Sequence, residues 1–157
     1  MATKLAEKKM ISGDPVYNSQ TVARLINRVM RSGKKGAAYK AVYDAFSEIE
    51  KKGLNPIETF EKAINNVSPK VEVRSKRVGG AAYQVPSEVR GDRRTSLAIR
   101  WIIAATAKKS NKEYRHFSQK LAAELIDASN GSGEAVKKKD TTHKMAEANK
   151  VFSHFRW

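Results

Sequence analysis

The 157-residue sequence contains no cysteine. Disulfide bonds and thiolate metal sites are therefore excluded. No run of apolar residues reaches the length of about 18 that a membrane-spanning helix needs. The first ten residues carry charge but lack the continuous apolar segment of a secretory signal. These absences predict an intracellular, cytoplasmic protein without a membrane partner.

Acidic residues are scarce relative to basic ones. The sequence has 31 Lys and Arg against 16 Asp and Glu, which gives a net charge of +15 and an isoelectric point of about 10.1. Such an excess attracts phosphate, and the binding weakens as salt rises because it depends on counterion release. The length and the 40% hydrophobic content predict one domain with a real core.

Apolar residues recur at helical spacing in three segments of the first half. Residues 22–30, 38–49 and 57–67 each carry one apolar stripe. Glu58 is placed as the glutamate of a capping box at the start of the third segment. N-caps and glycines bound these three predicted helices, namely Ser19, Gly33, Gly53 and Asn55.

The second half predicts three more helices, over about residues 92–105, 114–128 and 134–151, with the final residues trailing after the last one. The segment over residues 92–105 is apolar nearly all round, which predicts a central helix with Trp101 in the core.

Residues 70–100 contain eight Lys and Arg against three acids. Polar and apolar residues alternate on both sides of Gly79-Gly80, a pattern that predicts a β-hairpin over about residues 71–89. Because an isolated two-stranded ribbon has no core of its own, this cationic hairpin is interpreted as an arm that lies on nucleic acid. The turn fixes two cross-strand pairs, Lys76 with Tyr83 and Arg74 with Val85.

The predicted fold is all-α, a single bundle of about six helices with a protruding β-hairpin arm. A basic, flexible N-terminal tail is expected over residues 1–15, and a helical RNA-binding domain over residues 16–157. Residues 24–40 contain no acid, so one basic binding face is predicted. The second and third helices are expected to turn an acidic side away from the polyanion, with the acids Asp44, Glu48, Glu50, Glu58 and Glu61.

Basic side chains are the candidate phosphate ligands. In the tail, the first predicted helix and the start of the fourth they are Lys4, Lys8, Lys9, Arg24, Arg28, Arg31, Arg93, Arg94 and Arg100. In the arm the candidates are Arg74, Lys76, Arg77, Gly79, Gly80 and Tyr83. A solvated helix face explains the arginines of the first helix, and the run Lys137, Lys138 and Lys139, equally well. For Tyr83, packing across the strands against Lys76 is favoured over stacking on a base.

Catalytic and metal-binding patterns are missing. The three histidines, His116, His143 and His154, lack the spacing of a metal-binding motif. Gly33-Lys34-Lys35 lacks both the upstream glycine and the following Ser or Thr of a phosphate-binding loop. We therefore expect no enzyme, no metal and no cofactor.

Five motifs together resemble the family of bacterial-type small-subunit ribosomal protein number seven. The resemblance extends over about residues 14–157 with compatible spacing. Its motifs are Asp14-Pro15-x-Tyr17, Gly33-Lys34-Lys35, Arg77-Val78-Gly79-Gly80 with Tyr83-Gln84-Val85-Pro86, Ala98-Ile99-Arg100-Trp101, and the run Thr142-His143-Lys144-Met145-Ala146-Glu147-Ala148-Asn149-Lys150.

This resemblance implies a helical domain with a β-ribbon arm that binds the 3′ major domain of small-subunit ribosomal RNA and nucleates assembly of the subunit head. It also implies contact with exit-site tRNA, with mRNA and with neighbouring ribosomal proteins including number eleven. By position, the ribosomal RNA would be held by the tail and by Lys34, Lys35, Arg77, Arg93 and Arg94. The arm tip and parts of the sixth helix would face the exit site. Some members of the family repress translation of their own messenger.

The chain departs from this family at two positions. Glu7 lies in a lysine-based tail where many relatives have an arginine cluster, and Gly91 stands where proline is common.

Two other functions are compatible with parts of the sequence. Residues 19–49 could form a helix-turn-helix that binds DNA, but its second helix offers mainly alanines instead of base-reading polar side chains. An RNA-modifying enzyme would need a cofactor fingerprint or an acid/base constellation, neither of which stands out.

Overall fold

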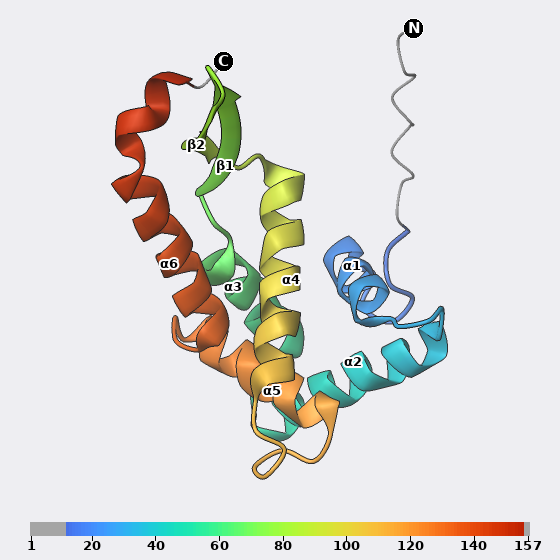
Figure 1. Cartoon of the computed structure of the whole chain (residues 1–157). Helices are drawn as coiled ribbons and strands as arrows, with labels where there is room; N and C mark the ends of the chain where they lie inside the picture. The colour runs from blue at the N-terminus through green and yellow to red at the C-terminus, as the bar shows by residue number, and fades with distance from the viewer. Residues whose placement is uncertain (1–11, 156–157) are drawn as a thin grey trace, which may run out of the picture.

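The computed structural model describes residues 12–155. Six α-helices, one 3₁₀ helix and one two-stranded antiparallel sheet make up these residues, which confirms the predicted helical bundle with a hairpin arm. In chain order the elements are α1 (Gln20–Val29), α2 (Lys35–Lys51), α3 (Pro56–Val67), β1 (Val71–Val78), β2 (Ala81–Glu88), α4 (Gly91–Lys108), α5 (Phe117–Ser129), α6 (Glu134–Ala148) and η1 (Lys150–Phe155). The arm and the end of α6 lie at one end of the molecule, and α5 lies towards the other (Figure 1).

The core forms where the apolar stripes meet. α5 packs against α2, α3 and α4, and every residue from 120 to 125 on it is buried. By contrast α4, expected to be the central helix, leaves Ala104 and Ala107 exposed. Trp101 packs against the core but is only partly buried, so it lies at the edge of the core and not within it as predicted. One side of α4 therefore borders solvent.

Some helices begin and end at the predicted residues, and others do not. Ser19 caps α1, since its Oγ accepts the Val22 N–H at 3.4 Å. α1 ends at Val29 instead of reaching Gly33, because the backbone of the next residue, Met30, is extended with φ −54° and ψ 132°. Asn55 caps α3 by accepting the N–H groups of the two residues after Pro56. Glu58 pairs instead with Lys62 at 2.6 Å, so the capping-box prediction is wrong.

The last two helices begin and end differently from their predictions. Tyr114 precedes α5, which begins at Phe117, because Gln119 accepts the backbone N–H of His116 and closes the first turn there. α6 ends at Ala148, and the residues expected to trail form η1 instead.

The start of the folded domain lies within the segment predicted to be a tail. Asp14 is 1% exposed, and its carboxylate accepts the N–H groups of Val16 and Tyr17 and the hydroxyl of Tyr43. Burial and this hydrogen bond raise the pKa of Tyr43. The Asp14-Pro15-x-Tyr17 motif thus anchors the chain to α2. Residues 1–11, including Lys4, Lys8 and Lys9, lie outside the described residues.

The arm has the predicted register, with Lys76 opposite Tyr83 and Arg74 opposite Val85. Its turn uses two residues with positive φ, 58° and 89°, which glycine adopts without strain. The Tyr83 ring lies 5.3 Å from that of Phe152 and 5.1 Å from that of Phe155. Packing against η1 therefore supplies the apolar cover that the ribbon lacks, and Lys76 Nζ adds a hydrogen bond to the Phe155 carbonyl at 3.3 Å.

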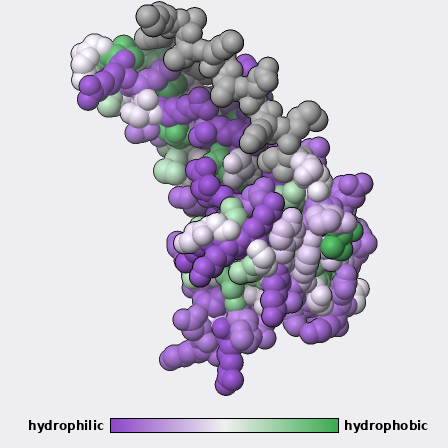
Figure 2. All heavy atoms as spheres, turned by 90° about the vertical axis from the view of Figure 1, so that its right-hand side faces the viewer, coloured by the Kyte–Doolittle hydropathy of each residue, from purple (hydrophilic) through white to green (hydrophobic). Residues whose placement is uncertain are grey.

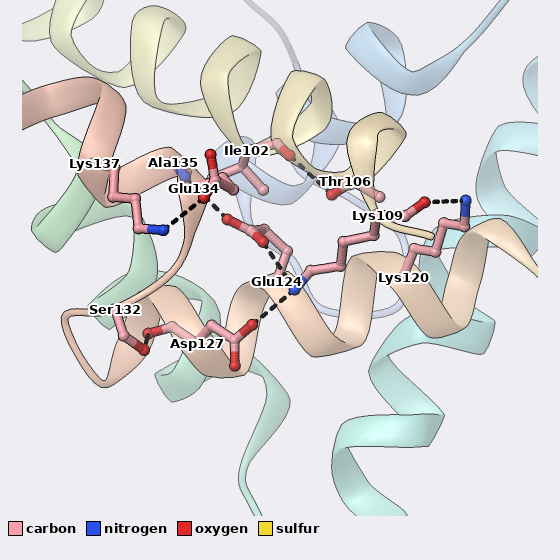
Figure 3. A network of polar contacts seen from close by, with 10 residues as sticks. All are labelled: Ile102, Thr106, Lys109, Lys120, Glu124, Asp127, Ser132, Glu134, Ala135 and Lys137. Atoms are coloured by element: carbon pink, nitrogen blue, oxygen red, sulfur yellow. Dashed lines mark hydrogen bonds and ion pairs between the residues drawn. The ribbon is translucent and has the colours of Figure 1, made fainter. Parts of the chain in front are cut away.

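A buried ion pair joins three helices (Figure 3). Glu124 on α5 is fully buried; its Oε1 accepts the Ala135 N–H at 3.0 Å and its Oε2 lies 3.1 Å from Lys109 Nζ. Burial alone lowers the pKa of Lys109, but the hydrogen bonds that Lys109 donates to Asp127 and Glu124 outweigh this effect and raise the pKa. Gly133 has a φ of 93°, and a Cβ there would lie 3.0 Å from Glu124 Oε1. The carboxylate thus fixes the end of α4 and the start of α6 on α5.

We expect Glu124→Leu to lower the free energy of unfolding by about 3 kcal/mol, because it leaves the Ala135 N–H without an acceptor and removes one carboxylate from Lys109. Glu124→Gln should lose less, since its amide oxygen still accepts the Ala135 N–H. Denaturant unfolding of the two variants measures both losses. Wild-type stability in the leucine variant would contradict a structural role for this pair.

Candidate nucleic-acid interface

The turn between α1 and α2 carries unpaired cations. Arg28, Arg31 and Lys34 are exposed, and none of them has an acidic partner within residues 12–155. Lys35 is also exposed, with its Nζ 5.6 Å from the centre of the Tyr39 ring. Unpaired, hydrated cations are free to bind phosphate without first breaking an ion pair. This face, seen from the side of α1 and α2, is mainly hydrophilic with small apolar areas (Figure 2).

Arg24 differs from the other arginines of α1. It is half-buried and pairs with Asp92 on α4 at 3.4 Å. The structure therefore gives Arg24 a position that links two helices, whereas Arg28 on the next turn points to solvent.

A second buried carboxylate lies at the base of the arm. Glu72 is 7% exposed and pairs with Arg74 at 2.7 Å and with Arg93 at 2.8 Å. Burial by itself raises the pKa of Glu72, but the hydrogen bonds and charges of Arg93 and Arg74 outweigh it and hold the pKa below its ordinary value. Both arginines bond Glu72 through Nε, so their terminal nitrogens remain available for phosphate.

Further cations gather between the arm and α6. Arg94 is half-buried, and its Nε has no hydrogen-bond partner within the described residues. It lines a hollow of about 590 Å³ together with Lys70, His143 and Lys150. His143 Nε2 accepts the Lys70 N–H at 3.0 Å, and burial lowers the pKa of its imidazole. This histidine therefore serves as a neutral acceptor that ties α6 to the residue before β1.

The remaining candidates are divided between solvent and the protein interior. Arg77 and Arg100 are exposed. On α6, Lys138 is exposed and Lys137 pairs with Glu134 at 2.7 Å. Lys139 turns inward and donates a hydrogen bond to the Asn66 carbonyl at 2.9 Å. This lysine therefore links α6 to α3, in addition to any contact with RNA.

Within residues 12–155, the acids of α2 and α3 form no ion pair with the candidate cations. Asp44, Glu50, Glu58 and Glu61 are exposed, and Glu48 pairs with Lys51 at 2.7 Å. The two helices thus carry the neutral-to-acidic side that their composition predicts.

Three buried acids are not predicted by the sequence patterns, namely Asp14, Glu72 and Glu124. In β1 the alternation of Val71, Glu72 and Val73 indicates that the valines face inward, yet Glu72 is the buried residue and the valines are only partly buried. Arginines on two elements make that burial possible, and the distance between them is a tertiary property. The proximity of an acid to several arginines in the sequence is the one signal that points to it.

The described residues contain neither a candidate metal-binding group nor a candidate membrane-spanning helix. Within residues 12–155, no three His, Asp or Glu side chains come together as a metal-binding group. Over the same span, none of the helices combines the length and the hydropathy required to cross a bilayer.

Sequence comparisons decide the family. The family model for Ribosomal protein S7p/S5e matches residues 1–150. The chain belongs to this family. It is 56% identical over 152 residues to small ribosomal subunit protein uS7 of Thermoanaerobacter sp. (strain X514), covering 96% of both chains. Over 151 residues it is 57% identical to the uS7 protein of Caldanaerobacter subterraneus subsp. tengcongensis, with 96% of this chain and 95% of the relative covered.

Membership in the S7p/S5e family makes the chain a structural, RNA-binding ribosomal protein of the small subunit and not an enzyme. Gly91, the position at which the family resemblance leads us to expect proline, is the first residue of α4. The preceding Arg90 has φ −78° and ψ 158°, a conformation that proline also allows in the residue before it. The glycine thus preserves the geometry of the helix start.

We expect the contribution of Glu72 to stability to depend on pH. Because the folded pKa is depressed, the contribution is complete above the ordinary value of 4.5 and is lost as the pH falls through the folded pKa. Glu72→Gln should therefore cost about 1–2 kcal/mol at pH 7 and progressively less below pH 4.5. Thermal unfolding across this range measures the difference. Glu88→Gln on the exposed side of β2 is the control, and a pH-independent gap for Glu72→Gln would contradict the ion pairs.

Proposed function

We propose that this protein binds the 3′ major domain of small-subunit ribosomal RNA and nucleates assembly of the subunit head. The observation that carries the proposal is the row of unpaired cations from Arg28 to Lys35, on a chain of this family with a net charge of +15. Arginine and lysine side chains without acidic partners gain most from phosphate contact. In a bacterial cell such a subunit lies in the cytoplasm, as the relatives' names imply.

The arm is proposed to serve a different partner. Its tip, from Arg77 to Ala82, extends beyond the contacts that Lys76 and Tyr83 make with η1. The tip therefore contributes little to the fold and is available to the exit-site tRNA and the mRNA. The neighbouring protein number eleven is proposed as a protein partner from the family resemblance.

The DNA-binding alternative receives no support from the exposed side of α2. That side carries Asp44, Glu48 and Glu50, which repel a polyanion, while the apolar side is committed to the core.

We expect the triple variant Arg31→Ala, Lys34→Ala and Lys35→Ala to bind the RNA fragment more weakly. The slope of log K against log salt should become shallower by about 0.7–0.9 for each phosphate that the variant no longer neutralises, so by about 2–3 in total. Titration of the full chain with the 3′ major domain at several salt concentrations measures both quantities.

The matched control is Lys51→Ala, Lys52→Ala and Lys62→Ala. It removes the same charge from the side where two of the three lysines pair with acids. If the control weakened binding as much as the first triple variant, net charge alone would explain the affinity. A wild-type protein with no salt-dependent affinity for the fragment would overturn the proposed function.

Deleting residues 77–82 and rejoining the strands with Asn-Gly should leave thermal stability and incorporation into small subunits unchanged, because Tyr83 keeps its contacts with η1. Retention of exit-site tRNA by the assembled ribosomes should fall. Incorporation is measured by sedimentation, and tRNA retention by filter binding. A deletion variant that failed to incorporate would show that the arm tip serves assembly instead.

A further inference from the structure

A groove lies among the end of α1, the start of α2 and the C-terminal half of α4. Its volume is about 610 Å³, which lies within the range of sites that hold small organic molecules. Ala107 is exposed, and most of the other floor side chains are only partly buried. The floor is apolar, with Val29, Met30, Ala38, Ile103, Ala107 and Phe117.

Cations alone form the charged part of the rim. Arg28, Arg31 and Lys34 line the groove, and its lining contains no acid. Three other hollows of the described residues differ, because acidic side chains line each of them: Glu88 and Glu147 between the arm and α6, Asp44 and Glu48 between α2 and α5, and Glu134 between α4 and α6. The combination of an apolar floor with an entirely basic rim sets this groove apart from them.

Phosphate contacts explain the rim but not the floor. A phosphate gains nothing from Val29, Ile103 or the ring of Phe117, whereas an unstacked base has two apolar faces to bury. We propose that the groove accepts one unstacked base of ribosomal RNA, while Arg28, Arg31 and Lys34 hold the adjacent phosphates. This inference rests on the proposed function and adds the kind of RNA recognised at this face, a bulged or looped nucleotide.

Charge argues against the tail of this chain as the occupant of the groove. The tail of this chain carries Lys4, Lys8 and Lys9 against the single acid Glu7, so the basic rim repels it. Ribosomal RNA supplies in one molecule both the negative charge for the rim and the apolar surface for the floor.

Ala107→Trp tests the groove directly. Because Ala107 is exposed, an indole there fills the groove without entering the core. We expect about tenfold weaker binding of the full chain to the RNA fragment, the loss typical of one stacked base. The salt slope should stay unchanged, since no phosphate ligand is removed. The control is Ser47→Trp, at an exposed position in the hollow that Asp44 and Glu48 line, and it should bind like the wild type.

An abasic scan of the RNA fragment provides the second measurement. One nucleotide should exist whose base removal weakens wild-type binding about tenfold but weakens the Ala107→Trp variant no further, because both changes remove the same contact. The scan with the wild-type protein can be measured even if the Ala107→Trp variant is unstable.

Several results would overturn the inference. Wild-type affinity in Ala107→Trp, a shallower salt slope in that variant, or no abasic position coupled to it would each exclude an inserted base. If Ala107→Trp bound the RNA fragment normally but was not incorporated into small subunits with the other ribosomal proteins, the groove would instead bind a polypeptide. If the wild-type chain itself failed to bind the fragment, the proposed function would fall; if it bound while Ala107→Trp made no difference, only the groove inference would fall.

Discussion

The arrangement of the helices depends on the buried carboxylate of Glu124. It is the one acidic side chain that Lys109 at the end of α4 and the N–H of Ala135 at the start of α6 both reach. Because removing a charge from water costs several kcal/mol, this carboxylate stabilises the fold only while its partners stay in place. One residue of α5 therefore connects the end of α4 with the start of α6.

A second carboxylate does the same for the arm. Glu72 holds Arg74 of its own strand and Arg93 of α4, so the base of the ribbon is fixed to the bundle. Both arginines are also candidate phosphate ligands. Since a guanidinium has five N–H donors, an ion pair through Nε and a phosphate contact through the terminal nitrogens do not compete. Structural and binding roles therefore coincide in the same side chains at this end of the molecule.

The candidate site could be predicted from the sequence only in part. The basic character of the segment from Arg28 to Lys35 and the isolation of the acids on α2 and α3 follow from the order of residues. Whether each cation is paired with an acid, bonded to the protein interior or free cannot be predicted from that order. Arg24 is paired, Lys139 bonds inward and Lys34 is free, although all three are basic residues on or beside helices. The partners of Arg24 and Lys139 lie 68 and 73 residues away along the chain.

The local features of this protein follow directly from the order of its residues. Apolar spacing set the helices, Gly79-Gly80 set the register of the arm, and composition set the charge, because each depends on neighbours within a few residues. Tertiary packing, by contrast, places η1 against Tyr83, leaves Trp101 partly exposed and opens an apolar groove beneath Arg28 and Arg31. These features arise where separate elements meet, and the distances between such elements are fixed by packing of the whole chain.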